Sequence, residues 1–259
     1  MQARVFRSLT MSKTKTIVIG GITGGIGAAL ARRLVASGHT VAGFSRDPDK
    51  LKALSEELGI ATCTCDATDC AAIEAQLPEF HQQLGSIDGY VHAIGSIYLK
   101  AAHMTPENDW LNTLHLNLSS AFYALRASTK LMMKQGSGAC LFFSTAAAQT
   151  GLANHEAIAA AKGGIEAMVR SAASTYSSRG LRINAIAPSL TDTPLAKPII
   201  GNPQALEFSK KMHPLGEIGQ ADHVASLAEW LLSEEARFVT GQTYVIDGGL
   251  SSVVPKPKA

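Results

Sequence analysis

TIVIGGITGGIG, which spans Thr16–Gly27, is the stretch that decides the fold of this 259-residue chain. Its first part, Thr16–Ile19, is a short apolar run and predicts a buried strand. The glycine-rich part follows at once and leads into a helix-like stretch, Gly25–Ser37. Glycines permit a tight turn and let the backbone approach a pyrophosphate, while the helix N-terminus offers unpaired N–H groups and a positive dipole end. A strand, a glycine-rich turn and a helix in this order predict a dinucleotide site.

Short apolar runs alternate with helix-like stretches along the rest of the chain. Strand–helix alternation with continuous apolar strands predicts a parallel sheet covered by helices on both faces. About seven strands and their helices account for the whole length, so we expect a single doubly wound α/β domain over residues 15–252. The expected strands are Thr16–Ile19, Thr40–Ser45, Ile60–Cys65, Gly89–Ala93, Ala139–Ser144, Arg182–Ala187 and Thr243–Ile246. The expected helices are Gly25–Ser37, Asp47–Leu58, Ala71–Leu84, Trp110–Gln135, Glu156–Arg179 and Ala221–Ser233.

The composition permits a large core and excludes several classes of protein. Apolar residues make up 46% of the chain and charged residues 17%, which argues against disorder. Lys plus Arg number 23 against 21 for Asp plus Glu, so no basic surface for nucleic acid is indicated. No uncharged apolar run approaches the roughly 18 residues of a membrane span, and no secretory pattern is present. We therefore expect a cytoplasmic protein with neither a nucleic acid nor a membrane as partner.

Both ends are expected to lie outside the folded domain, and the cysteines do not indicate a metal site. Residues 1–14 are expected to form a flexible N-terminal extension, with either Met1 or Met11 as the natural start. The tail, 253–259, contains two prolines and two lysines and is expected to fray. The cysteines indicate a reduced compartment and small buried side chains, because their spacing is not that of a zinc site. They are Cys63, Cys65, Cys70 and Cys140.

The segment 191–216 breaks the strand–helix rhythm. It contains four prolines with short apolar patches between them. In doubly wound folds, a long excursion after a late strand covers the ligand crevice at the carboxyl ends of the strands. We therefore interpret this segment as a substrate lid, with an ordinary surface excursion as the alternative.

The end of the second expected strand indicates which dinucleotide is bound. NAD binders place an acid here to hold the ribose 2′-hydroxyl, but this chain has Ser45, followed by Arg46. An arginine can form forked, charge-assisted hydrogen bonds with a 2′-phosphate, which favours NADP over NAD. Asp47 precedes Pro48 and is interpreted as a helix N-cap. At the end of the third strand, Asp66 can accept from the adenine amino group or serve as a turn residue.

Several motifs occur in one order along the chain. Glycines 21, 25 and 27 fit TGxxxGxG, although Gly20 replaces the threonine, and Gly95 is the residue kept from NNAG. Residues 184–189 fit NxxxPG with Ser189 in place of glycine, and residues 214–219 fit PLGRxG in part. Residues 240–249, TGQTYVIDGG, fit a C-terminal signature closely. From residue 15 to 251 the chain thus resembles the short-chain dehydrogenase/reductase family, and most resembles its 3-oxoacyl-carrier-protein reductases.

The resemblance implies a Rossmann fold, a small-molecule substrate, and a homotetramer or homodimer, while Ser45 and Arg46 indicate NADP as the cofactor. The motifs and the strand ends together indicate which residues bind the cofactor. These are Gly21, Thr23, Gly25, Ile26, Gly27, Ser45, Arg46, Asp66, Ala67, Gly95, Asn117, Lys162, Pro188 and Thr193.

The family mechanism requires a tyrosine, a lysine, a serine and an asparagine. Lys162 and Asn117 stand at the matching positions. The serine position is taken by Thr145, whose hydroxyl can polarise a carbonyl; Ser144 is the second candidate. The tyrosine position, four residues before Lys162, is taken by Ile158, which has no ionisable group and no side-chain donor.

Three hypotheses account for the missing tyrosine. In the first, another group donates the proton: His155, two turns before Lys162 on the same helix face, or Tyr98. In the second, water or the substrate supplies the proton to an activated alkene or iminium. In the third, the chain is a silent NADP-binding sensor or a partner subunit. The leading interpretation is an atypical NADP-dependent oxidoreductase that transfers hydride to a carbonyl or conjugated substrate.

Overall fold

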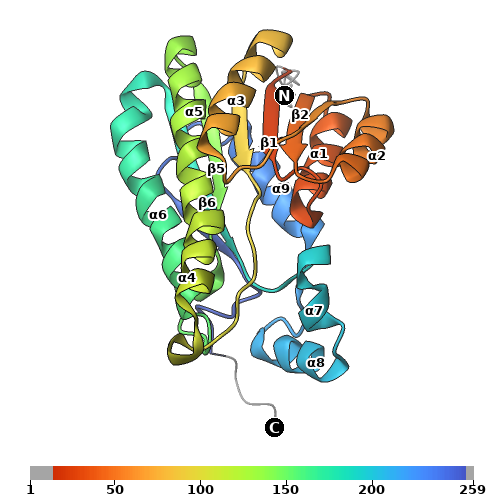
Figure 1. Cartoon of the computed structure of the whole chain (residues 1–259), viewed down its shortest axis with the longest axis vertical. Coiled ribbons are helices and arrows are strands. Elements are labelled where there is room, and N and C mark those ends of the chain that lie inside the picture. Colours follow the sequence, from red (N-terminus) through yellow and green to blue (C-terminus); the bar gives the residue numbers. More distant parts are fainter. Residues whose placement is uncertain (1–13, 255–259) are drawn as a thin grey trace, which may run out of the picture.

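The computed structural model describes residues 14–254, and its centre is a seven-stranded parallel sheet (Figure 1). The expected N-terminal extension, apart from its last residue, and the end of the expected tail lie outside the described residues. The strand order is β3-β2-β1-β4-β5-β6-β9, so the order reverses between β1 and β4, as in a doubly wound fold. The strands are β1 (Thr16–Gly20), β2 (Thr40–Ser45), β3 (Ala61–Thr64), β4 (Gly89–His92), β5 (Gly138–Phe143), β6 (Leu181–Pro188) and β9 (Thr243–Ile246).

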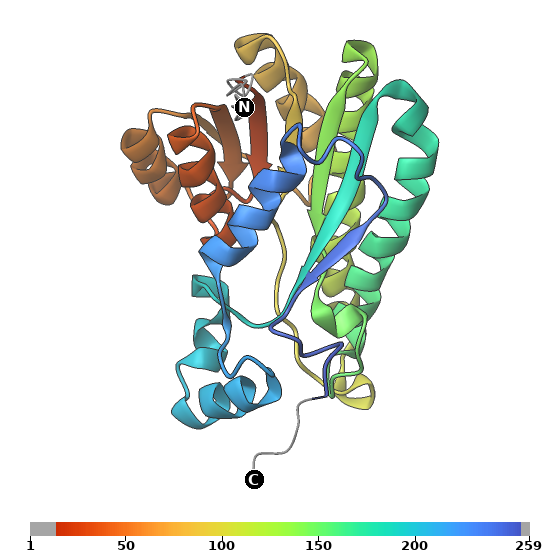
Figure 2. The ribbon, with the colours of Figure 1, turned by 180° about the vertical axis from the view of Figure 1, so that it is seen from behind.

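Helices cover both faces of the sheet, as the alternation predicted. One core cluster packs α3 (Cys70–Leu84), α5 (Ser120–Gln135) and α6 (Glu156–Tyr176) on one face, which Figure 1 presents. The second cluster packs α1 (Gly25–Ala36), α2 (Pro48–Leu58) and α9 (Ala221–Leu232) on the other face, and α9 crosses the front of Figure 2. Successive side chains of β1 divide between the clusters, because neighbouring residues of a strand point to opposite faces.

The long helix expected over Trp110–Gln135 is interrupted. The chain forms α4 (Glu107–Leu114), then a π-helical turn over His115–Ser119, and then α5. Side chains compete here with the helical hydrogen bonds: Asn117 Nδ2 donates to the Thr113 carbonyl oxygen at 3.0 Å, and Ser120 Oγ donates to that of Leu116 at 2.6 Å. The sequence interpretation missed this turn, and π-helical turns often occur at functional sites.

The segment expected to be a lid forms two short helices at one end of the molecule, α7 (Lys197–Ile200) and α8 (Pro203–Met212) (Figures 1 and 2). Its two ends are brought together by β7 (Thr191–Asp192), which pairs with β8 (Gly219–Gln220) in a separate two-stranded sheet. The excursion therefore leaves the main domain and returns to it at one place.

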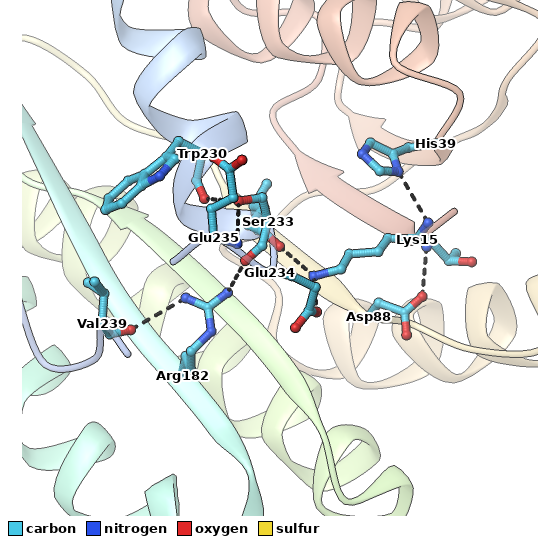
Figure 3. A network of polar contacts seen from close by, with 11 residues as sticks. Lys15, His39, Asp88, Arg182, Trp230, Ser233, Glu234, Glu235 and Val239 are labelled. Carbon is cyan, nitrogen blue, oxygen red and sulfur yellow. Dashed lines mark hydrogen bonds and ion pairs between the residues drawn. The ribbon is translucent and has the colours of Figure 1, made fainter. Parts of the chain in front are cut away.

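A polar network fixes the opposite end of the sheet, near the amino ends of the strands (Figure 3). Lys15 Nζ donates to the Leu232 carbonyl oxygen at 2.9 Å and pairs with Glu234 at 2.7 Å. Arg182 donates to the carbonyl oxygens of Ser233 and Val239. These contacts hold the C-terminal end of α9 against β1 and β6. Within residues 14–254, no helix is long and apolar enough to cross a membrane, and no cluster of His, Cys, Asp and Glu could hold a metal ion.

Candidate active site

A cavity of about 600 Å³ opens at the carboxyl ends of the strands, between the sheet and the 191–216 segment. This is the place where doubly wound folds bind their ligands. Of the residues implicated by sequence, the cavity gathers Ile26, Gly95, Ser144, Thr145, His155, Ile158, Lys162, Pro188 and Thr193. The other expected cofactor residues do not line it, because they lie toward β1, β2 and β3 or behind the cavity wall.

The glycine-rich turn after β1 has the geometry that a phosphate site requires. Gly21 has a positive φ of 78°, and a Cβ there would lie 2.6 Å from the carbonyl oxygen of Ala93. The first turn of α1 has neither a side-chain cap nor an acidic residue, so its N–H groups and positive dipole end stay available to an anion. Thr193 packs against this turn, because a Cβ on Gly25 would lie 2.6 Å from Thr193 Cγ2.

The end of β2 fits a ribose that carries a 2′-phosphate. The Ser45 hydroxyl is buried and has no hydrogen-bond partner among the described residues. Arg46 is exposed and forms no ion pair with residues 14–254. Asp47 is committed elsewhere: it accepts from the backbone N–H of Lys50 at 3.1 Å and pairs with the Lys50 ammonium at 2.8 Å. Asp47 therefore caps α2, as predicted. The Ser45 hydroxyl and the Arg46 guanidinium remain available to the ribose and its 2′-phosphate.

Asp66 is a turn residue with one oxygen to spare. Its Oδ1 atom accepts from the backbone N–H and the hydroxyl of Thr68, at 2.9 and 2.8 Å. These bonds, led by the one from the Thr68 backbone, hold the pKa of Asp66 below its usual value. The Oδ2 atom has no hydrogen-bond partner among the described residues. Asp66 can therefore stabilise the turn and also accept from the adenine amino group. Ala67, next to it, is buried in the core.

Lys162 and Asn117 meet at Gly95. A Cβ on Gly95 would lie 2.9 Å from Asn117 Oδ1 and 3.1 Å from Lys162 Nζ. Lys162 is 6% exposed, burial lowers its pKa to about 8, and its ammonium donates to the Phe143 carbonyl oxygen at 3.0 Å. Asn117 bonds through both side-chain atoms to Ser96 and also donates to the Thr113 carbonyl oxygen. Its side chain therefore positions the loop after β4, and leaves little capacity for holding a water molecule directly.

The two hydroxyl candidates after β5 point in different directions. Thr145 Oγ1 accepts from the backbone N–H of Ala147 at 3.3 Å, which leaves its own proton able to donate to a substrate oxygen in the cavity. Ser144 Oγ donates toward α6, to Glu166 Oε1 at 2.7 Å and the Lys162 carbonyl oxygen at 3.1 Å. The Ser144 hydroxyl thus anchors the strand end that carries Thr145.

Ile158 faces the cavity one helical turn before Lys162 and is 5% exposed. His155 precedes α6 and also lines the cavity, with Nδ1 at 2.8 Å from the Ala153 carbonyl oxygen. Tyr98 does not line the cavity, although both of its neighbours in the chain do. Its hydroxyl donates to Asp109 at 2.9 Å, and partial burial followed by this bond raises its pKa. Of the two alternative proton donors, His155 therefore lines the cavity and Tyr98 does not.

No motif in the sequence indicated a role for His92, which lies three residues before Gly95. It is 1% exposed and joins a chain of hydrogen bonds: Tyr90 Oη to Nδ1 and Nε2 to Ser120 Oγ, each 3.0 Å. Burial, followed by the charge of Lys162, lowers the pKa of His92 to about 3, so the ring is neutral. This series of hydrogen bonds holds the π-helical turn against β4. The Tyr90 hydroxyl would also lie 2.8 Å from a Cβ on Gly20, which explains why glycine replaces threonine there.

Fold and site together define a class: an α/β oxidoreductase with a phosphate-binding turn and a largely apolar cavity at the strand ends. The chain belongs to the short-chain dehydrogenase/reductase family, because a family model described as enoyl-(acyl carrier protein) reductase matches residues 21–251. The enzymes of this family bind nicotinamide cofactors, NAD or NADP.

Two relatives and one solved structure illustrate the match. The 3-oxoacyl-[acyl-carrier-protein] reductase of Salmonella typhimurium is 30% identical, over 92% of this chain and 98% of the relative. A protein named inactive 2-(S)-hydroxypropyl-CoM dehydrogenase 2, from Xanthobacter autotrophicus, is also 30% identical, over 86% of this chain and all of the relative. A short-chain type dehydrogenase/reductase from Mycobacterium ulcerans has a TM-score of 0.88 at 28% identity, covering 92% of this chain and 90% of that one. The family and fold expected from the motifs are thereby confirmed.

Proposed function

We propose that this protein is an NADP-dependent reductase of a carbonyl or conjugated small molecule that works without the family tyrosine. The observation that carries the proposal is the cavity, which brings the Thr145 hydroxyl and the Lys162 ammonium together beside the glycine-rich turn. Thr145 donates a hydrogen bond to the substrate oxygen and so stabilises the charge that develops there. Lys162 holds the ribose of the cofactor, and Asn117 positions the loop that carries Gly95.

The residues fit NADP along the whole path from turn to cavity. Gly21, Gly25 and the N-terminus of α1 would hold the pyrophosphate, while Ser45 and Arg46 would hold the 2′-phosphate. When bound, the cofactor supplies the hydride for the reduction. Bound beside Pro188 and Thr193, its nicotinamide would lie next to the cavity.

The lining favours an uncharged and largely apolar substrate. Lys162 is the only Lys, Arg, Asp or Glu among the lining residues of the described chain. Exposed apolar side chains lie at the cavity on the 191–216 segment and on the loop after β4. We propose that the 191–216 segment is the lid that closes over such a substrate. The exposed side chains are Ile97, Leu99, Leu195, Phe208 and Met212.

Thr145→Ala tests the proposal directly. We expect wild-type protein to oxidise NADPH with at least one member of a panel of ketones, aldehydes and enones. The variant should lose about 100-fold in kcat/KM, because it removes a donor to the reacting oxygen. Thr145→Ser, which keeps the hydroxyl, should stay close to wild type. Equal activity of Thr145→Ala and wild type would contradict the assigned role.

Arg46→Ala tests the choice of cofactor. Loss of a charge-assisted contact of about 1.5–3 kcal/mol should weaken NADPH binding by roughly 10- to 100-fold. NADH binding should change little, because NADH has no 2′-phosphate. Titration calorimetry at one ionic strength measures both, with the exposed Lys52→Ala on α2 as the charge-matched control. Equal losses for NADPH and NADH would defeat the 2′-phosphate assignment.

A catalytically silent NADP-binding sensor or partner subunit is the second candidate. Two observations favour it: the phosphate-binding turn is intact, whereas an isoleucine faces the cavity at the tyrosine position. One of the relatives is itself named inactive. Tight NADPH binding without turnover of any panel member would favour this candidate. The homodimer or homotetramer implied by the resemblance stays a prediction.

A further inference from the structure

The cavity contains a paired serine and histidine that the roles above do not use. Ser189 directly follows β6, and His213 directly follows α8, so the pair joins the sheet to the 191–216 segment. Ser189 Oγ and His213 Nε2 lie 2.8 Å apart, and His213 is 4% exposed. Both side chains line the cavity that Thr145 and Ile158 line.

The hydrogen bonds of His213 determine which way the proton points. Nδ1 lies 2.6 Å from the carbonyl oxygen of Ser209. A carbonyl oxygen can only accept, so Nδ1 carries a proton. With one ring proton, Nε2 presents a lone pair to which Ser189 Oγ donates; with a second proton, Nε2 donates to Ser189 Oγ. A hydroxyl, a basic ring nitrogen within hydrogen-bond reach and a third group that orients the ring form an arrangement suited to proton transfer.

A carboxylate, that of Asp247, lies near the His213 ring. Asp247, directly after β9, is 7% exposed and accepts from the backbone N–H groups of Gly249 and Ser251 at 2.9 and 2.7 Å. Burial opposes its ionisation, but these hydrogen bonds and the nearby His213 hold the pKa of Asp247 below its usual value. The same loop packs on the ring, since a Cβ on Gly248 would lie 3.5 Å from His213 Cδ2.

His155, the other histidine of the cavity, is less suited to the task. It stands directly before α6. Among the described residues its ring has one hydrogen bond, between Nδ1 and the Ala153 carbonyl oxygen, and no hydroxyl bonds to its Nε2 atom.

We propose that Ser189 exchanges the proton with the substrate oxygen and that His213 acts through Ser189, in the role that the family gives to a tyrosine. This inference rests on the proposed oxidoreductase function. In the oxidative direction, the alcohol proton passes to Ser189 Oγ while the Ser189 proton passes to His213 Nε2. The electron pair of the carbinol C–H bond leaves as hydride to the nicotinamide cofactor, and a carbonyl forms. Reduction is the reverse of these transfers: the carbonyl carbon gains the hydride, the oxygen gains the Ser189 proton, and Ser189 Oγ takes the Nε2 proton of the His213 imidazolium, which returns to the form with one ring proton.

The test compares Ser189→Ala, Ser189→Thr and His213→Gln in the full chain with NADPH and the best panel substrate. Ser189→Ala and His213→Gln should each lower kcat about 100-fold, within the usual contribution of general acid–base catalysis. Ser189→Thr keeps a hydroxyl and should retain most of the activity. His213→Gln keeps an oxygen that can accept from Ser189 but takes up no proton, so a merely structural bond would survive this change. Ser226→Ala and His81→Gln, both distant from the cavity, are the matched controls.

The outcomes distinguish a failure of the proton relay through Ser189 and His213 from a failure of the proposed reductase function. Turnover by wild type together with unchanged kcat in Ser189→Ala and His213→Gln would overturn the relay and leave the reductase standing. A large loss in His155→Gln alone would assign the proton to His155 and likewise overturn the relay. NADPH binding with no turnover by wild type would overturn both. Circular dichroism and NADPH affinity check that each variant folds; if His213→Gln fails to fold, the contrast between Ser189→Ala and Ser189→Thr decides.

Discussion

Ile158→Tyr is expected to raise the kcat of ketone reduction about 100-fold in a His213→Gln variant and about tenfold in the wild-type chain. Ile158 faces the cavity four residues before Lys162, so the two side chains share one face of α6. A tyrosine at this place would present its hydroxyl to the cavity beside Thr145. The Lys162 ammonium would lower the pKa of that hydroxyl and so help it to exchange a proton.

The control for this gain is Ile158→Phe, which adds the same ring without the hydroxyl. Steady-state kinetics with NADPH and the panel ketones measures all four variants: Tyr and Phe, each in wild-type and His213→Gln chains. A gain shared by tyrosine and phenylalanine would reflect pocket shape and not proton donation. An inert tyrosine variant that folds and binds NADPH normally would show that the site lacks more than one side chain.

Lys162→Met is expected to stabilise the cofactor-free protein by about 2 kcal/mol at pH 7 while it weakens NADPH binding at least tenfold. Burial lowers the pKa of Lys162 from 10.5 to about 8, so the folded protein holds this proton less tightly than the unfolded chain. The lost ammonium contact with the Phe143 carbonyl oxygen offsets part of the gain. A change of this size should raise Tm by roughly 4–8 °C for a chain of this length.

The pH dependence gives an independent check. Below about pH 8 the lysine is protonated in both states, and the full penalty of burying the charge is present. Between about pH 8 and 10.5 the unfolded chain binds more protons than the folded protein, so stability rises with pH in wild type. The difference between wild type and Lys162→Met should therefore shrink over this window in denaturant titrations. Lys130→Met, exposed on α5, is the charge-matched control, and equal slopes for wild type and Lys162→Met would contradict the assignment.

Local patterns explain most of the expectations that the structure bears out. The apolar runs became parallel strands, and the glycine-rich turn adopts a positive φ at Gly21. Asp47 caps α2, as its place before Pro48 indicated. These features depend on backbone sterics and on contacts within a few residues, which a single sequence displays directly.

Other features depend on a side chain's distant partners. The Tyr98 hydroxyl donates to Asp109, and the Ser144 hydroxyl donates to Glu166 on α6, 22 residues away. The π-helical turn at Asn117 exists because side chains take the carbonyl oxygens of Thr113 and Leu116, a competition that the apolar periodicity does not reveal. Each of these outcomes was decided by which acceptor lay within reach after packing.

By itself, the sequence determined the doubly wound fold, the phosphate-binding turn and the replacement of a tyrosine by Ile158 beside Lys162. The alternation of side chains along a strand and the proximity of residues i and i+4 on a helix follow from backbone geometry alone. Only the tertiary structure decided that Ser189 meets His213, because their contact spans 24 residues and requires α8 to pack back over the end of β6. Nothing in the local sequence of either residue encodes the 2.8 Å between them, since that distance is set by the packing of the whole excursion.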